Sequence, residues 1–262
     1  MKKEISIVGG GASALLLACE LDPEKFDVNI YEKNAALGRK FLVAGEGGLN
    51  LTHSENEVNF LGRYTPYSFL QEAFAHFSNK HLMLWLKEIG IETFVGSSGR
   101  VFPRKEMKPI EVFNIILDRV KKKKVLIHTK HCWKGFSEKN DLLFEVGNEV
   151  KKITSDYTVF CLGGASWPVT GSAGDWTVFF SEKKITILPF RASNCAFKVH
   201  WPSAFISKTE GKVLKNISTR CANKTHLGEI VITRFGLEGS GIYPLSPEIR
   251  KQLDEVKTAE IF

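Results

Sequence analysis

The chain has 262 residues, of which 43% are hydrophobic and 25% charged, a composition typical of a globular protein that buries a substantial core. No apolar run approaches the roughly 20 residues that span a bilayer, so we expect no membrane partner. The net charge of +7 is dispersed, so we expect no nucleic-acid partner. Five scattered cysteines, never in C-x-x-C spacing, indicate reduced thiols in a cytoplasm and no metal site.

The first thirty residues carry a dinucleotide-binding pattern. Residues 5–8 predict a buried strand, a helix follows that ends near Leu21, and residues 28–31 predict a second strand. Between the first strand and the helix the sequence fits G-x-G-x-x-G/A, which provides a tight turn, close backbone approach to a pyrophosphate and close helix–strand packing. The helix N-terminus adds unpaired N–H groups and partial positive charge. The residues predicted to bind the cofactor here are Gly9, Gly10, Gly11, Ala12, Ser13 and Ala14.

Glu32 closes the second strand and is placed to accept hydrogen bonds from ribose hydroxyls. It argues against a 2′-phosphate, although the neighbouring Lys33 weakens that inference. Two other interpretations are that the glycines only form a turn, and that the N-terminus is a secretory signal ending in a lipoprotein-like site at Cys19. Three consecutive glycines would be unusual inside an apolar signal core, so we favour the dinucleotide interpretation.

Residues 38–54 form a glycine-rich stretch. Gly45, Gly47 and Gly48 occur within four positions, which is too dense for a regular element and indicates backbone held against something flat or phosphorylated. The alternative is an ordinary glycine-rich surface loop.

Side chains around these glycines are further candidates for cofactor binding. Arg39 and Lys40 follow Gly38 and are expected to reach the second phosphate of a dinucleotide. Asn50 and Thr52, on either side of Leu51, are expected to present amide and hydroxyl groups to a ring system. His53 is a conceivable proton donor, but a single loop histidine is more often structural, so we name no catalytic residue.

The segment G-R-K-x-x-x-A-G-x-G-G-L-N-L-T-H-S-E, behind an N-terminal dinucleotide fingerprint, resembles the HI0933-like flavoprotein family, which includes bacterial proteins called YhiN and BaiN. The resemblance implies an α/β fold: a Rossmann-like FAD-binding domain of the two-dinucleotide-binding-domain flavoprotein type with an inserted, mainly β second domain. It also implies FAD as cofactor and hydride transfer through flavin to a small-molecule substrate, with NAD(P)H as the reductant.

The sequence also departs from the usual family form of this loop, S-G-G-G-R-C-N-x-T-N. Glu46 replaces a glycine, Gly48 the arginine and Leu49 the cysteine, so the roles of that arginine and cysteine are not transferred to this chain.

Residues 66–90 predict one or two helices whose aromatic stripe at 3.6-residue spacing is expected to be core. A helix over residues 110–120, a strand over 125–129 and a hairpin over 133–136 and 142–146 follow. From Tyr157 a buried strand is expected to end in Gly163 and Gly164, where backbone passes close to a ligand or another strand. By resemblance this matches the A-T-G-G-type motif at which the chain returns to the FAD-binding sheet in these flavoproteins, although Cys161 and Leu162 depart from the usual Ala and Thr.

We expect two domains: residues 1–190 as the FAD-binding domain and residues 191–262 as part of the inserted β-rich domain. The second contains predicted strands over 195–199, 212–217 and 229–233, a turn made by Gly236, Gly239 and Gly241, and a polar helix over 246–256. Family members normally continue and return to cover the flavin, so the resemblance predicts that this chain alone binds FAD weakly or not at all.

Three functional hypotheses follow from the sequence. The first is a flavin-dependent oxidoreductase truncated from a longer form. The second is a nicotinamide-binding Rossmann protein without flavin. The third is a non-catalytic remnant or one half of a split flavoprotein.

Overall fold

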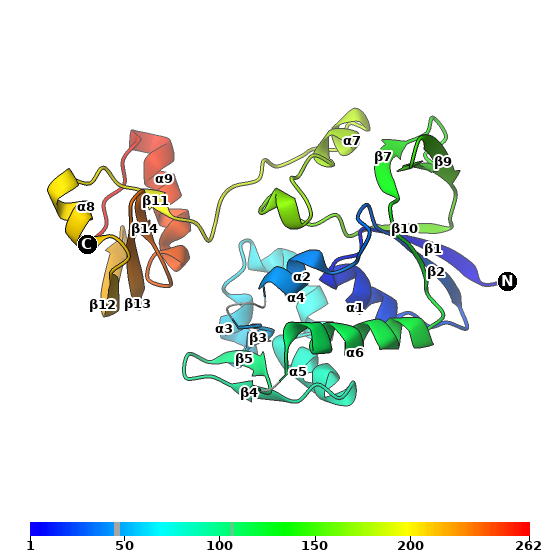
Figure 1. Cartoon of the computed structure of the whole chain (residues 1–262), viewed down its shortest axis with the longest axis horizontal. Helices are drawn as coiled ribbons and strands as arrows, with labels where there is room; N and C mark the ends of the chain where they lie inside the picture. Colours follow the sequence, from blue (N-terminus) through cyan, green and yellow to red (C-terminus); the bar gives the residue numbers. More distant parts are fainter. Residues whose placement is uncertain (45–47, 106) are drawn as a thin grey trace. The chain divides into compact units, whose positions relative to one another are not determined.

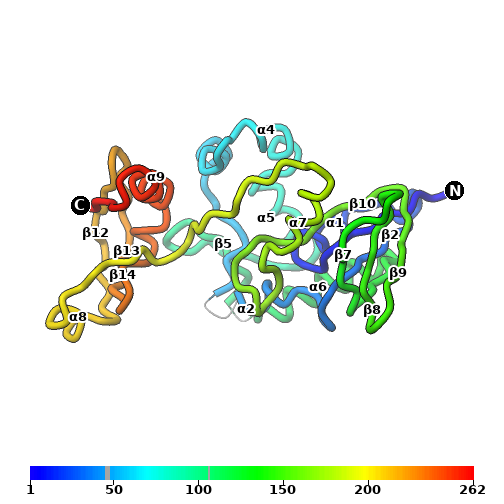
Figure 2. Tube along the Cα trace, turned by 90° about the horizontal axis from the view of Figure 1, so that it is seen from above, coloured from blue at the N-terminus to red at the C-terminus, as the bar shows by residue number. Residues whose placement is uncertain are grey.

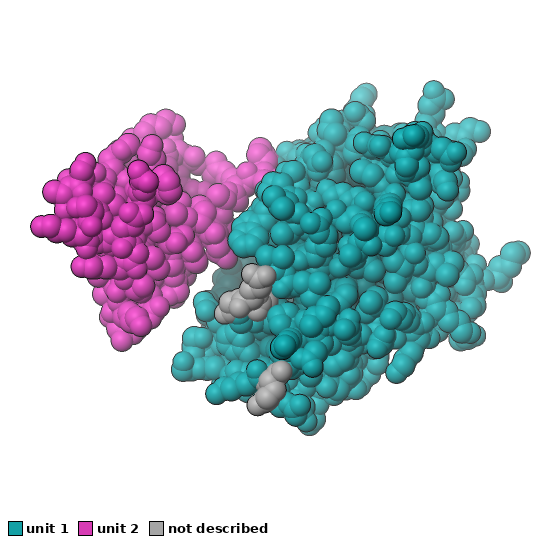
Figure 3. Space-filling view, in the orientation of Figure 1, with its two compact units in different colours: residues 1–188 teal, residues 189–262 magenta. Residues whose placement is uncertain are grey.

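The computed structural model describes residues 1–44, 48–105 and 107–262, which divide into two compact units, Met1–Leu188 and Pro189–Phe262 (Figure 3). The elements of the first unit are β1 (Lys3–Val8), α1 (Ala12–Glu20), β2 (Phe26–Tyr31), α2 (Arg39–Ala44), β3 (Thr52–His53), α3 (Glu57–Leu61), α4 (Tyr67–His76), α5 (Asn79–Glu88), β4 (Thr93–Val95), β5 (Arg100–Pro103), α6 (Pro109–Lys122), β6 (Leu126–His128), β7 (Cys132–Phe136), β8 (Leu142–Val146), β9 (Glu149–Ile153), β10 (Tyr157–Phe160), the 3-10 helix η1 (Pro168–Thr170) and α7 (Thr177–Glu182). Those of the second are β11 (Phe197–Lys198), α8 (Ser203–Thr209), β12 (Val213–Cys221), β13 (Lys224–Thr233), β14 (Gly236–Glu238), the 3-10 helix η2 (Tyr243–Leu245) and α9 (Ser246–Val256).

A parallel sheet in the order β10-β1-β2-β6 forms the centre of the first unit (Figure 1). Side chains alternate between the two faces of a strand. Ile7 and Ile30 therefore point to the face covered by α1 and α6, whereas Val8 and Tyr31 pack against the β7–β9 sheet on the other face. Burying each such aliphatic side chain contributes about 1.5–3 kcal/mol. The predicted α/β class with a parallel, Rossmann-like sheet is confirmed.

The strand predicted from Tyr157 forms, but it is not fully buried. β10 pairs only with β1 at the sheet edge, and Tyr157 remains 54% exposed. The hairpin of β7 and β8 is confirmed, and β9 extends it to an antiparallel three-stranded sheet whose strands lie side by side (Figure 2). β9 was not predicted, because its residues are mostly charged and exposed.

The residues expected to form one aromatic core stripe lie in two helices with different environments. In α5, Trp85 and Leu86 are buried. In α4 no residue is buried, and Phe69 is 82% exposed, so the prediction is wrong for this helix. The reason is that α4 packs along one side only, where Phe74 stacks on Phe60 of α3 with the ring centroids 5.5 Å apart.

The second unit is an antiparallel sheet in the order β11-β14-β13-β12 with α9 packed on it. Its core contains Ile230 of β13 and Ile249 of α9. The helix predicted over residues 246–256 is confirmed, whereas Gly236 begins a strand that was predicted as a turn. Within the described parts of both units, no helix is long and apolar enough to cross a membrane.

Candidate functional site

A cavity of about 600 Å³ opens at the carboxyl ends of β1, β2 and β10. This is the edge of a parallel sheet where α/β proteins bind ligands. Most residues predicted to bind the cofactor line it: Gly9, Gly10, Gly11, Ala12, Ser13, Glu32, Lys33, Gly38, Arg39, Lys40, Gly163 and Gly164. The structure therefore brings four separate stretches of sequence to one cavity.

The other predicted site residues do not line this cavity. Ala14 is fully buried against the sheet, as its packing role requires. Gly48, Asn50, Leu51 and Thr52 lie in the segment leading into β3, where the Leu51 N–H donates to the Val101 carbonyl at 2.8 Å. Residues 45–47, which include two of the three clustered glycines, lie outside the described residues. The short helix α2, which precedes these glycines in the sequence, was not predicted.

The turn between β1 and α1 leaves donors available to a ligand. The first N–H groups of a helix have no partner within it. Gly11, the N-cap of α1, provides no side-chain cap, and a Cβ atom on Gly11 would meet nothing within 4 Å. Gly9 has the opposite environment, with φ +102° and with the Cys161 backbone against its Cα. An anion can therefore approach the backbone at Gly11, whereas at Gly9 the Cys161 backbone occupies the position of a Cβ atom.

Glu32 is the acid at the end of β2, and 8% of it is exposed. Its Oε2 accepts the Gly10 N–H at 2.8 Å. Its Oε1 accepts the backbone N–H and the side-chain amide of Asn34, at 2.8 and 2.6 Å. Its own backbone is fixed to the segment after β6, through the carbonyl of His128 and the N–H of His131. Glu32 is thus a rigidly held carboxylate beside the phosphate-binding turn.

Arg39 and Lys40, at the start of α2, donate hydrogen bonds to residues of the segment that follows Gly164. The Arg39 guanidinium donates to the Val169 carbonyl at 3.0 Å and to Asn34 Oδ1 at 2.8 Å. Lys40 Nζ donates to the carbonyl and hydroxyl of Ser166, at 3.0 and 2.7 Å. We call residues 166–170 the strap. Two cations predicted to reach a phosphate therefore line the cavity and also hold the strap.

Four aromatic side chains that were not predicted also line the cavity, and we call them the aromatic wall: Tyr31, His131, Trp133 and Phe179. These residues come from β2, the start of the β7–β9 sheet and α7, and no local pattern connects them. Tyr31 stacks on His128 with the ring centroids 4.7 Å apart.

Burial in and beside this wall shifts the pKa values of three side chains. It raises the pKa of the Tyr31 phenol. Burial, together with the neighbouring His131, lowers the pKa of His128. Burial also raises the pKa of the Cys161 thiol at the strand end, which disfavours the thiolate.

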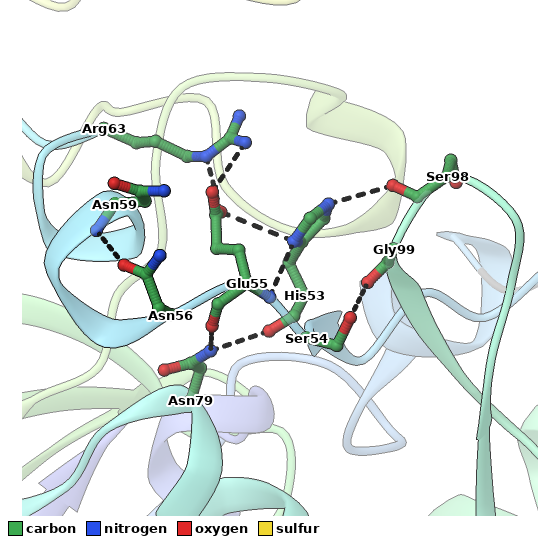
Figure 4. A network of polar contacts seen from close by, with 9 residues as sticks. All are labelled: His53, Ser54, Glu55, Asn56, Asn59, Arg63, Asn79, Ser98 and Gly99. Carbon is green, nitrogen blue, oxygen red and sulfur yellow. Dashed lines mark hydrogen bonds and ion pairs between the residues drawn. The ribbon is translucent and has the colours of Figure 1, made fainter.

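His53 lies away from the cavity in a polar network (Figure 4). Its Nε2 is 3.0 Å from the Ser98 carbonyl oxygen, and its Nδ1 accepts the Glu55 N–H at 3.2 Å. A carbonyl only accepts and an N–H only donates, so Nε2 carries a hydrogen toward Ser98, while Nδ1 also lies 3.4 Å from the Glu55 carboxylate. Glu55 is in turn paired with Arg63 at 2.5 Å. Both ring nitrogens are engaged by backbone, so the geometry supports the structural interpretation of His53.

Metal binding has no candidate in residues 1–44, 48–105 and 107–262, where no group of three or more His, Cys, Asp or Glu side chains is placed to hold an ion. The chemistry available at the cavity consists of backbone N–H donors, one fixed carboxylate, several cations and an aromatic wall.

A parallel sheet with a glycine-rich first turn and an acid at the end of the second strand defines a Rossmann-like dinucleotide-binding domain of the flavoprotein class. The chain belongs to the HI0933-like family: the domain described as HI0933-like protein Rossmann domain matches residues 3–241. This agrees with the resemblance noted from the sequence, and the family is one of flavin-binding proteins.

Two curated relatives match over most of the chain. The 3-dehydro-bile acid delta(4,6)-reductase of Clostridium scindens is 23% identical, over 98% of this chain and 63% of that protein. The ribosomal RNA dihydrouridine synthase of Haemophilus influenzae is 22% identical, over 92% of this chain and 60% of that protein. The chain thus spans less than two thirds of the length of either relative.

Solved structures are more distant. The THI4 protein of Thermovibrio ammonificans aligns with a TM-score of 0.41 at 16% identity, over 64% of this chain and 61% of that one. A 3-ketosteroid-delta4-(5alpha)-dehydrogenase of Rhodococcus jostii aligns with a TM-score of 0.44 at 9% identity, over 62% of this chain and 46% of that one.

Proposed function

We propose that the chain binds FAD in the cavity of its first unit and serves a flavin-dependent oxidoreductase that takes hydride from NAD(P)H. The observation that carries this proposal is the pairing of an uncapped helix N-terminus with a fixed acid in one cavity. The α1 N–H groups would bind the pyrophosphate, and Glu32 would bind the ribose. Bound FAD would supply hydride acceptance and transfer.

Residues 1–190 would form the FAD-binding domain and residues 191–262 part of the inserted β-rich domain. Lys33, Arg39 and Lys40 would add positive charge beside the phosphates. Gly163 and Gly164 would bring the backbone after β10 close to the cofactor. The aromatic side chains of Trp133 and Phe179 would exclude water from the flat apolar surface of the cofactor.

The proposed reaction class is reduction of a carbon–carbon double bond. The names of both curated relatives, a bile-acid reductase and a ribosomal RNA dihydrouridine synthase, describe such a step. A small organic molecule is the first candidate substrate. RNA is the second, although the sequence predicted no nucleic-acid partner, because the Haemophilus relative and the MnmC proteins of Campylobacter jejuni are named for RNA modification.

The test is to titrate the purified chain with FAD, ADP and NAD in separate experiments and to measure binding by isothermal titration calorimetry. FAD is added in excess because the resemblance predicts that this chain alone binds FAD weakly or not at all. We expect FAD and ADP to bind and Glu32→Gln to weaken both about 10- to 100-fold, since a hydrogen bond to a charged group is worth about 1.5–3 kcal/mol. The control is Glu24→Gln at an exposed position. Saturable NAD binding without FAD binding would favour a nicotinamide-binding protein, and binding of none of the three would favour a non-catalytic remnant.

A further inference from the structure

The Glu32 carboxylate is already largely committed to protein donors. An ionised carboxylate offers about four lone-pair positions, two on each oxygen. Oε1 accepts two N–H groups, both from Asn34, and Oε2 accepts one from Gly10. Across the part of the chain that the structure describes, one acceptor position is left, and it is on Oε2.

The amide orientation of Asn34 is fixed by its other neighbour. Arg39 Nη1 lies 2.8 Å from Asn34 Oδ1, and a guanidinium can only donate, so this atom is the oxygen. The amide nitrogen therefore faces Glu32. Asn34, Glu32, Gly10 and Arg39 all line the cavity. Asn34 thus occupies Oε1 through an arrangement that a single amide flip cannot reverse.

We propose that Asn34 is a positioning residue that leaves Glu32 one free acceptor, so that the chain recognises the ribose of an adenine dinucleotide through one hydroxyl and not through two. This inference rests on the proposed function and specifies how its cavity selects the sugar. The hydrogen bonds continue from Asn34 through Arg39 to the Val169 carbonyl, so Glu32 and the strap belong to one hydrogen-bonded chain of residues. A second ribose hydroxyl would bind Glu32 only if one of the three existing bonds were broken.

The experiment compares ADP, 2′-deoxy-ADP and 3′-deoxy-ADP by calorimetry on the full chain. We expect one deoxy analogue to bind within about twofold of ADP and the other to bind about 10- to 100-fold more weakly, the loss of one hydrogen bond to a charged group. Equal losses for the two analogues, or no loss for either, would overturn the inference while leaving ADP binding intact. Failure of ADP itself to bind would overturn the proposed function, and the inference with it.

The Asn34→Ala variant tests the positioning role separately. Removing the amide frees the second position on Oε1, so the two analogues should converge to within about threefold of each other. A merely structural role would weaken ADP and both analogues by the same factor and preserve their ratio, which would contradict the proposal. Asn223→Ala, at the exposed turn between β12 and β13, is the matched control and should keep the wild-type ratio. If Asn34→Ala does not fold, Asn34→Ser replaces it, and the comparison of analogues on the wild type still decides the number of hydroxyls.

Discussion

The backbone of Gly9 lies against the carbonyl group of Cys161, so closely that a Cβ atom on Gly9 would overlap the Cys161 oxygen. Backbone cannot rotate away as a side chain can, and φ of +102° is itself unfavourable for any residue with a Cβ. Gly11, two residues later, has open space where a Cβ would be placed. The same type of residue therefore serves packing at one position and access at the other.

Gly9→Ala should consequently lose stability, whereas Gly11→Ala should lose nucleotide affinity. We expect Gly9→Ala to lower the free energy of unfolding by about 2 kcal/mol or more, from overpacking and backbone strain. Gly11→Ala should cost less than about 1 kcal/mol but should weaken ADP binding, because its methyl group occupies the path to the helix N-terminus. Chemical denaturation and ADP titration measure the two effects. Unchanged ADP affinity in Gly11→Ala would place the phosphates elsewhere.

Arg39 should control the mobility of the strap. Arg39→Ala removes the hydrogen bonds to Val169 and Asn34, and each is worth about 0.5–1.5 kcal/mol. We expect amide hydrogen exchange over residues 166–171 to accelerate about 2- to 10-fold, measured by mass spectrometry. Arg234→Ala, an exposed arginine of the second unit, is the control and should leave this segment unchanged. Equal exchange in Arg39→Ala and wild type would show that the strap is held by other contacts.

His128 should make the stability of the first unit depend on pH. Its pKa is lowered in the folded state by burial and by His131, so the unfolded chain binds the proton more readily. The free energy of unfolding should therefore fall as the pH drops through the ordinary histidine pKa, near 6.5. His128→Gln should flatten this part of the profile, whereas His76→Gln at an exposed position should not. A profile unchanged by His128→Gln would assign the dependence to other groups.

His53 should matter for stability and not for cofactor binding. His53→Ala removes the hydrogen bonds to the exposed Ser98 carbonyl and the partly buried Glu55 N–H, each worth about 0.5–1.5 kcal/mol. We expect a lower midpoint of thermal unfolding with ADP affinity within about twofold of wild type. Loss of ADP affinity at unchanged stability would contradict the structural role.

The local elements of the nucleotide site were predictable because their signals are local. The strand–turn–helix around Gly9 and the acid at Glu32 follow from periodicity and spacing within thirty residues. The contact of Arg39 with Val169 was not predictable, because it joins positions 130 residues apart through a backbone carbonyl, which every residue carries. Asn34 was missed for a related reason. An asparagine three residues after a strand is typical of a turn, and only the orientation of Glu32 shows that Asn34 also donates to its carboxylate.

Two other elements carried no local signal. The run from Arg39 to Ala44 contains no glycine and forms a short helix that was not predicted. The alternating Glu-Val-Lys-Lys of β9 carried too little apolar character to predict a strand. β9 adopts its strand conformation through antiparallel pairing with β8.

The position of β1 in the sheet has a consequence for synthesis of the chain. β1 and the phosphate-binding turn are synthesised before β10 (Tyr157–Phe160), the strand that pairs with one side of β1. At about 5–20 residues per second, the nascent chain spends on the order of ten seconds with that edge of β1 open. An open apolar edge invites pairing with other chains. Chaperone protection during translation should therefore matter most in this interval, before the last wall of the cavity exists.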